Sequence, residues 1–205
     1  MHTLFTIGHS THEFSKFLGL LKQHDIRALA DVRSHPFSRI PWFNRPPLKS
    51  YLNVNNIHYV FLGNELGARR VERECYVGLR VDYDRIAKTE QFLKGLDRLK
   101  VGMRKYSIAL MCAERDPLDC HRTILVCRHA KEFADIFHIH GDGHLESHKE
   151  AEDRLLSRYV PKEGDLFRSR KELLNEAYTK RGEEIAFVEQ PRTNLLDEES
   201  LTNEL

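Results

Sequence analysis

The stretch YSIALMCAERDPLDCHRTIL, residues 106–125, changes from one hydrophobic pattern to another around a charged turn. An apolar, β-rich run ends at Cys112, and charged residues with Pro117 follow it. Apolar residues resume at helical spacing after Cys120, which predicts a helix from His121 to Ala130. A strand, a short turn and a helix in this order are typical of a βα unit.

Further runs of the same kind alternate along the chain. The predicted strands are residues 3–10, 26–34, 57–63, 106–112 and 135–143, and further helices are expected around 14–21, 48–52 and 92–99. This alternation predicts an α/β three-layer sandwich with a mostly parallel central sheet of about five strands and helices on both faces. We assign residues 1–160 to this domain. Residues 161–205 are expected to form a helical extension with a disordered tail at 191–205.

The composition is that of an ordinary soluble protein, with 40% hydrophobic and 31% charged residues. No apolar run approaches the roughly 20 residues that a membrane helix needs, so no membrane partner is expected. The N-terminal residues lack a signal-peptide pattern, which predicts a cytoplasmic protein. The four cysteines have no framework spacing and are therefore expected to be reduced thiols. No feature specifies an oligomeric state.

Polar residues stand where several of the predicted strands end. These ends read Gly8-His9-Ser10, Asp31-Val32-Arg33, Cys112-Ala113-Glu114 and His140-Gly141-Asp142. Right-handed crossovers place the carboxyl ends of parallel strands on one edge, where ligands of open α/β sheets bind. We therefore expect one pocket at this edge, with His9 nearby and lined by Asp31, Arg33, Glu114 and Arg122.

Cys120 is the first candidate for a reactive group because it precedes a helix. The helix dipole and nearby cations, including a protonated His121, would stabilise its thiolate. The alternative is a small thiol packed under the loop. Cys112 is a core residue, a redox partner of Cys120, or a metal ligand with Cys120 and His121. Glu114 is the candidate general acid or base, and His9 or His121 would shuttle protons.

The candidate anion-binding residues are Asp31, Arg33, Ser38, Arg39 and Arg122. Arg122 falls in a first helical turn, where a guanidinium and free N–H groups suit a phosphate. Its alternative is an ion pair with Asp116 or Asp119. Asp31 and Arg33 alternate along a strand and point to one face, so they either contact a ligand or form a structural salt bridge.

The segment 34–51 contains basic and aromatic residues but no acidic one. Its cations and aromatics are Arg39, Arg45, Lys49, Phe37, Trp42, Phe43 and Tyr51. Cations that meet phosphates beside aromatics that stack on bases suit single-stranded nucleic acid. The alternative is a proline-rich lid whose aromatics pack onto the sheet.

No cofactor is predicted, although four histidines keep a divalent metal open as an alternative. They are His138, His140, His144 and His148. His144 and His148, four residues apart, would share one helical face, a spacing that zinc sites use. No Cys or Glu completes an established motif with them. Cys127 is expected in the core, and Cys75 is expected to be incidental.

Several of these motifs together resemble the family called domain of unknown function 488. They are TIGHS at 6–10, DVRSHPFSR at 31–39, LMCAERDPLDCHR at 110–122 and HIHGDGHLESH at 138–148. The resemblance covers roughly residues 3–150. It implies a three-layer α/β fold and no established reaction.

These observations favour a small cytoplasmic enzyme that acts on a phosphate-bearing substrate, either a nucleotide or a nucleic acid. The sequence does not decide its reaction. One alternative is a non-enzymatic nucleic-acid-binding module that uses the 34–51 segment. The other is a thiol redox or metal protein that uses Cys112, Cys120 and His121.

Overall fold

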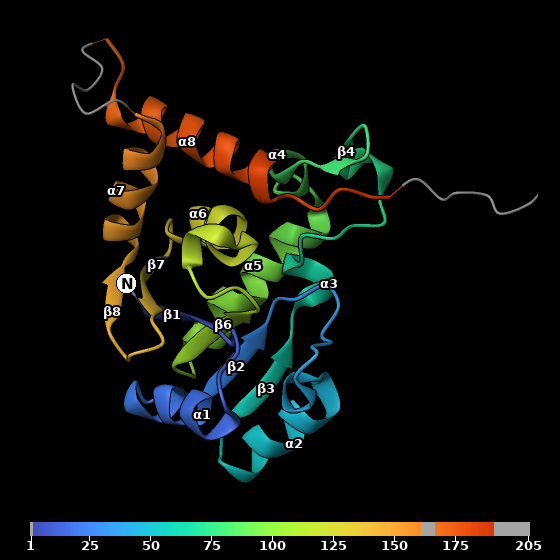
Figure 1. The fold of residues 1–205 in the computed structure, drawn as a ribbon, viewed down its shortest axis with the longest axis vertical. Coiled ribbons are helices and arrows are strands. Elements are labelled where there is room, and N and C mark those ends of the chain that lie inside the picture. The colour runs from blue at the N-terminus through green and yellow to red at the C-terminus, as the bar shows by residue number, and fades with distance from the viewer. Residues whose placement is uncertain (1, 161–166, 191–205) are drawn as a thin grey trace, which may run out of the picture.

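The computed structural model describes residues 2–160 and 167–190, so the tail expected at 191–205 lies outside the described residues. A six-stranded sheet with the order β3-β2-β6-β1-β7-β8 forms its centre (Figure 1). The strands are β1 (His2–Gly8), β2 (Ala28–Asp31), β3 (His58–Phe61), β6 (Ile108–Cys112), β7 (Ala134–Ile139) and β8 (Leu145–Ser147). All neighbours pair in parallel except β7 and β8, which confirms the predicted α/β class.

Helices cover both faces of this sheet (Figure 1). The helices are α1 (Phe14–Gln23), α2 (Arg45–Val54), α3 (Gly63–Leu66), α4 (Tyr83–Ile86), α5 (Glu90–Met103), α6 (Arg128–Ala130), α7 (His148–Tyr159) and α8 (Arg170–Ile185). The shorter elements are η1 (Pro41–Phe43), η2 (Arg73–Cys75), η3 (Pro117–Asp119), the π-helical η4 (Arg122–Cys127), and the hairpin strands β4 (Tyr76–Val77) and β5 (Arg80–Val81).

Strand β6 shows how the sequence pattern makes the layers. Every residue of β6 is buried, as expected for a central parallel strand covered on both faces. Ala109 and Met111 pack against the α1 and α2 side of the sheet. Ile108, Leu110 and Cys112 alternate with them and pack against the α5 and α8 side. The thiol of Cys112 therefore lies on the same side of the sheet as α8.

Helix α8 contributes to the core on that side. A capping box formed by Ser169 and Glu172 begins the helix and satisfies backbone N–H groups of its first turn. Ala177 and Tyr178 are buried in the larger hydrophobic cluster. Among the described residues, no helix has both the length and the apolar character needed to cross a bilayer.

One local expectation is wrong. Residues 145–147 form the short antiparallel edge strand β8, and α7 begins only at His148, so His144 and His148 do not share a helical face. The helix expected around 48–52 is confirmed as α2, which begins three residues earlier, at Arg45. Pro46 and Pro47 lie in the first turn of that helix, where the missing proline N–H groups would have had no helical partner.

Candidate functional site

A cleft of about 320 Å³ opens at the carboxyl ends of β2 and β6, and the chain that leaves α8 forms one of its walls. We call it the carboxyl-edge cleft. Its lining residues are Arg33, Ser34, His35, Phe37, Ala68, Arg69, Tyr83, Cys112, Ala113, Glu114, Asp119, Cys120, His121, Ile185 and Phe187.

Two thiols and one imidazole meet at the buried end of this cleft. Cys112 ends β6, while Cys120 and His121 directly precede η4. The Nδ1 atom of His121 lies 3.6 Å from Sγ of Cys112 and 4.0 Å from Sγ of Cys120. Its Nε2 lies 3.0 Å from the carbonyl oxygen of Val32. A carbonyl can only accept, so Nε2 donates its proton there and the Nδ1 lone pair faces both sulfurs.

The two thiols differ in acidity. Burial alone would raise the pKa of Cys120, but the neighbouring Cys112 thiol, the charge of Arg122 and the contact with His121 outweigh it and hold this pKa well below its ordinary value. The pKa of Cys112 is raised well above its ordinary value because it donates to Cys120 and is buried. These opposite directions make Cys120 the more acidic of the two thiols.

Glu114 adds a carboxylate at the rim of the cleft. Its side chain is solvent-exposed and forms no hydrogen bond or ion pair within the described residues. Partial burial and the nearby Cys120 raise the pKa of this carboxyl. An unpaired carboxylate with a raised pKa, close to a thiolate, is suited to proton transfer.

Cationic and aromatic side chains line the mouth of the cleft. Arg69 and His35 are exposed there, and neither has an acidic partner in the described part of the chain. The Arg69 guanidinium lies 4.7 Å from the ring centroid of Phe187, and its backbone N–H donates to Ser34 Oγ. The Phe37 ring is 76% exposed, an unusual position for a large aromatic residue. The mouth therefore offers positive charge beside aromatic surface.

Arg122 does not line the cleft. It is 1% exposed, and its guanidinium donates to the carbonyl oxygens of Glu114 at 2.7 Å and Arg115 at 3.3 Å. Gly8 makes room for this contact, since a Cβ at that position would lie 1.8 Å from the Glu114 carbonyl oxygen. Arg122 therefore holds the loop that carries Glu114, and its charge acts on the thiols from below the cleft.

Asp31 and Arg33 form a buried salt bridge. The Arg33 guanidinium donates to both carboxylate oxygens of Asp31, at 2.9 and 2.7 Å, and the Tyr59 hydroxyl donates to the same carboxylate at 2.8 Å. His9 stacks on Phe43, and burial with the charge of Arg33 lowers its pKa to about 4. Of this group only Arg33 lines the cleft. Arg33 and Glu114 therefore line the cleft, whereas the prediction that Asp31 and Arg122 also line it is wrong, because both are buried outside it.

Part of the 34–51 segment packs against the protein, while its basic side chains Arg39, Arg45 and Lys49 are exposed. Phe43 is fully buried, Trp42 packs on the same cluster, and the Arg45 guanidinium stacks on Phe61 at 4.2 Å. Ser38 is used in local turns, because its backbone N–H donates to Asn44 and its hydroxyl accepts from Ile40. Arg39 is exposed but outside the cleft. This arrangement fits the alternative of a packed lid more closely than an open stacking surface.

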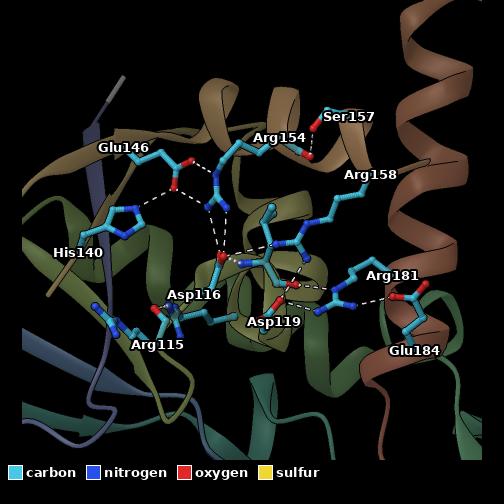
Figure 2. Close-up of polar contacts among 12 residues, drawn as sticks. Arg115, Asp116, Asp119, His140, Glu146, Arg154, Ser157, Arg158, Arg181 and Glu184 are labelled. Carbon is cyan, nitrogen blue, oxygen red and sulfur yellow. Dashed lines mark hydrogen bonds and ion pairs between the residues drawn. The ribbon is translucent and has the colours of Figure 1, made fainter. Parts of the chain in front are cut away.

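An ion-pair network fixes the loop between Glu114 and Cys120 to α7 and α8 (Figure 2). Arg154 of α7 bridges Asp116 and Glu146, and Arg158 contacts Asp116 and Asp119. Arg181 of α8 donates to Asp119 at 2.5 Å and to the Leu118 carbonyl at 3.0 Å. Asp116 and Asp119 were the alternative ion-pair partners of Arg122. Both carboxylates instead pair with arginines of α7 and α8.

The four candidate histidines do not form a ligand set. Both ring nitrogens of His138 are engaged, with Thr6 Oγ1 at 2.8 Å and with His148 Nδ1 at 3.2 Å. His140 contacts the Glu146 carboxylate, and His144 stacks against His140. Within the described residues, the group with metal-ligand geometry is instead Cys112, Cys120 and His121.

Fold and cleft together define an α/β protein with a thiol- and imidazole-lined site at the carboxyl edge of a parallel sheet. The chain belongs to the family described as domain of unknown function DUF488, whose model matches residues 13–128. The match includes both thiols of the cleft and His121. No curated protein and no solved structure matches the chain significantly.

Several residues that line the cleft could not be predicted from the sequence. Tyr83, Ile185 and Phe187 reach it from segments that had no reactive motif. Arg69 stands two residues after Gly67, where a Cβ would lie 2.3 Å from Ser34 Oγ, and a Cβ at Gly63 would lie 2.1 Å from the Arg33 carbonyl oxygen. These two glycines were the available signal that the segment packs closely against the end of β2.

Proposed function

We propose that this protein is an enzyme that acts on a small phosphate-bearing substrate, a nucleotide, in the carboxyl-edge cleft. One observation carries the proposal: an unpaired carboxylate, Glu114, shares a cleft with two thiols and an imidazole at its buried end. Titratable groups with shifted pKa values in one cleft are typical of catalytic sites.

The mouth of the cleft supports the choice of substrate. Arg69 provides positive charge and His35 a ring N–H donor, neither with an acidic partner among the described residues, which suits a phosphate. The exposed Phe37 ring beside them can stack on a base. A mononucleotide matches a cleft of about 320 Å³, which is near the lower end of ligand-pocket volumes.

A nucleotide is favoured over a nucleic acid because Phe37 is the one aromatic residue of the 34–51 segment that lines the cleft. Phe43 and Trp42 pack on the core, and Tyr51, although 47% exposed, lies outside the cleft against Phe14, with ring centroids 4.9 Å apart. A polynucleotide groove needs several exposed rings in succession. We therefore expect single-stranded oligonucleotides to bind no more tightly than mononucleotides.

The test is a panel of nucleoside mono-, di- and triphosphates, the matching nucleosides, and short oligonucleotides. Binding is measured by calorimetry and conversion by mass spectrometry. Arg69→Met should weaken nucleotide binding about tenfold, the loss of roughly one charged hydrogen bond. Glu114→Gln should preserve binding and abolish conversion. Arg39→Met, an exposed arginine outside the cleft, is the matched control and should change neither quantity.

Two outcomes oppose the proposal. If nucleosides bind as tightly as nucleotides, the cleft does not recognise the phosphate. A panel with no binding and no conversion at low salt would overturn it. Oligonucleotide binding that is lost when Arg39, Arg45 and Lys49 are replaced would instead favour the binding-module alternative.

A further inference from the structure

We infer that Cys112, Cys120 and His121 hold a single zinc ion whose fourth coordination position opens into the carboxyl-edge cleft. The inference rests on the proposed function for the role of the metal, whereas the site itself is argued from the ligands alone. The candidate ligand atoms, two sulfurs and Nδ1, all lie within 4.8 Å of one another.

The distances agree with tetrahedral coordination. Zn–S and Zn–N bonds of roughly 2.3 and 2.1 Å at a tetrahedral angle place a sulfur and a nitrogen ligand about 3.6 Å apart. Nδ1 of His121 is 3.6 Å from the Cys112 sulfur and 4.0 Å from the Cys120 sulfur. A small rotation of the Cys120 side chain would complete the geometry.

The imidazole is already oriented as a ligand. Its Nε2 donates to the Val32 carbonyl at 3.0 Å, which fixes the tautomer and leaves the Nδ1 lone pair directed at the sulfurs. Metal-bound histidines nearly always donate their second ring nitrogen in this way, often to a backbone carbonyl. Val32, the residue that directly follows β2, thus provides the outer contact that a metal site requires.

The protein holds these ligands on rigid elements. Cys112 lies at the end of a fully buried strand, and the other two ligands immediately precede η4. The loop between them is held by Arg122 from below and by Arg154, Arg158 and Arg181 from outside (Figure 2). Arg122 donates only to backbone carbonyls in the described structure, so its buried charge has no carboxylate partner.

Ligand type and open access favour a catalytic zinc ion. Two thiolates and one imidazole select soft or borderline metals and match the three-ligand sites in which zinc keeps an open position. All three ligand residues line the cleft, so that position faces the substrate space. Glu114, at the rim of the same cleft, is positioned to exchange a proton with a group bound there.

The first experiment measures metal in the full chain purified with a reductant and without chelator. Elemental analysis should find about one zinc per chain, and cobalt substitution should produce a sulfur-to-cobalt charge-transfer absorption. Cys112→Ser, Cys120→Ser and His121→Gln should each lower zinc content at least about tenfold. Cys127→Ser and Cys75→Ser, two buried cysteines outside the cleft, should retain it.

Wild-type protein that holds no zinc and takes up neither added zinc nor cobalt overturns the inference, whatever happens to the variants. Iron or copper in place of zinc, a Cys112–Cys120 disulfide, or zinc loss in the Cys127 variant overturns it as well. The proposed function fails separately, because a zinc-loaded protein that ignores nucleotides refutes only the substrate. A zinc-free protein that converts nucleotides refutes only the metal.

Discussion

The Nδ1 atom of His121 lies 3.6 Å from the sulfur of Cys112, although eight residues separate them in the chain. Strand β6 places the thiol, and the start of η4 places the imidazole after a loop that turns back over the sheet edge. The density of charge in residues 114–122 follows from this geometry. The loop must be held in place, and its carboxylates Asp116 and Asp119 pair with arginines of α7 and α8.

The first prediction concerns thiol reactivity in protein that is reduced and stripped of metal. Cys120 should react with iodoacetamide before the other cysteines, and at a pH below the ordinary thiol pKa. It lines the cleft and has a lowered pKa, whereas burial raises the pKa of Cys75 and of Cys127. Peptide mass spectrometry across a pH series measures the order, and zinc should suppress the reaction. Faster labelling of Cys112 would show that the thiolate was assigned to the wrong sulfur.

The second prediction concerns the buried Arg122. Arg122→Met should lower the free energy of unfolding by at least about 2 kcal/mol, because it removes a buried side chain and two charge-assisted hydrogen bonds to the carbonyl oxygens of Glu114 and Arg115. Arg122→Lys should also destabilise, since a single ammonium cannot reproduce the planar guanidinium fork. Urea unfolding measures both. Arg115→Met, on the exposed side of the same loop, should stay within roughly 0.5 kcal/mol of wild type. Equal stability of the two methionine variants would contradict the role given to Arg122.

Much of the fold was predictable because its strands and helices have clear periods. The run 108–112 is apolar throughout, and the spacing after Cys120 is helical, so the βα junction could be predicted from residue types alone. Strand β8 was missed because three residues, Leu145 to Ser147, are too few to show alternation. Its pairing with β7 depends on tertiary contact rather than on a local pattern.

The site was predictable in its location and less so in its members. Topology brings the ends of β2 and β6 together, which is why Arg33, Cys112 and Glu114 lie in one cleft. The direction of a long side chain does not follow from topology. Arg122 turns inward to carbonyl oxygens, and Arg39 points to solvent away from the cleft. Phe187 approaches from a segment distant in sequence, which no local motif signals.

A third prediction tests the Asp31–Arg33 salt bridge as a structural pair. Asp31→Asn should cost about 3–5 kcal/mol, because it leaves the Arg33 charge buried and uncompensated. Replacing both partners, with Asp31→Leu and Arg33→Met, should cost less than Asp31→Asn alone, since no charge then remains buried. Tyr59→Phe removes one donor to the carboxylate and should cost about 1.5–3 kcal/mol. Chemical denaturation measures the free energy of unfolding of all three variants. A double variant that is less stable than Asp31→Asn would refute the structural role of the salt bridge.

The last prediction follows from a buried chain of polar groups between the sheet and the C-terminal helices. The hydroxyl of Thr6 lies 2.8 Å from His138, which contacts His148 at 3.2 Å, and His148 meets the Tyr178 hydroxyl of α8 at 3.0 Å. Burial lowers the pKa of His148 to about 4 and holds that of His138 well below its ordinary value. Both imidazoles are therefore neutral in the folded protein near pH 7.

Acid should therefore weaken the fold between pH 6.5 and 4. In the unfolded chain a histidine takes up its proton near pH 6.5, whereas folded His148 does so only near pH 4. The stability associated with neutral His148 is fully present above the unfolded pKa, and it is lost as pH falls towards the folded pKa. For His148 alone the loss of unfolding free energy at pH 5 relative to pH 8 is about 2 kcal/mol.

Urea unfolding at a series of pH values should show this fall in the free energy of unfolding with decreasing pH, and His148→Gln should make the slope smaller. His144→Gln, an exposed histidine four residues away, is the control that should leave the slope unchanged. If the pH dependence of the unfolding free energy is unchanged in His148→Gln, groups other than His148 cause the acid sensitivity.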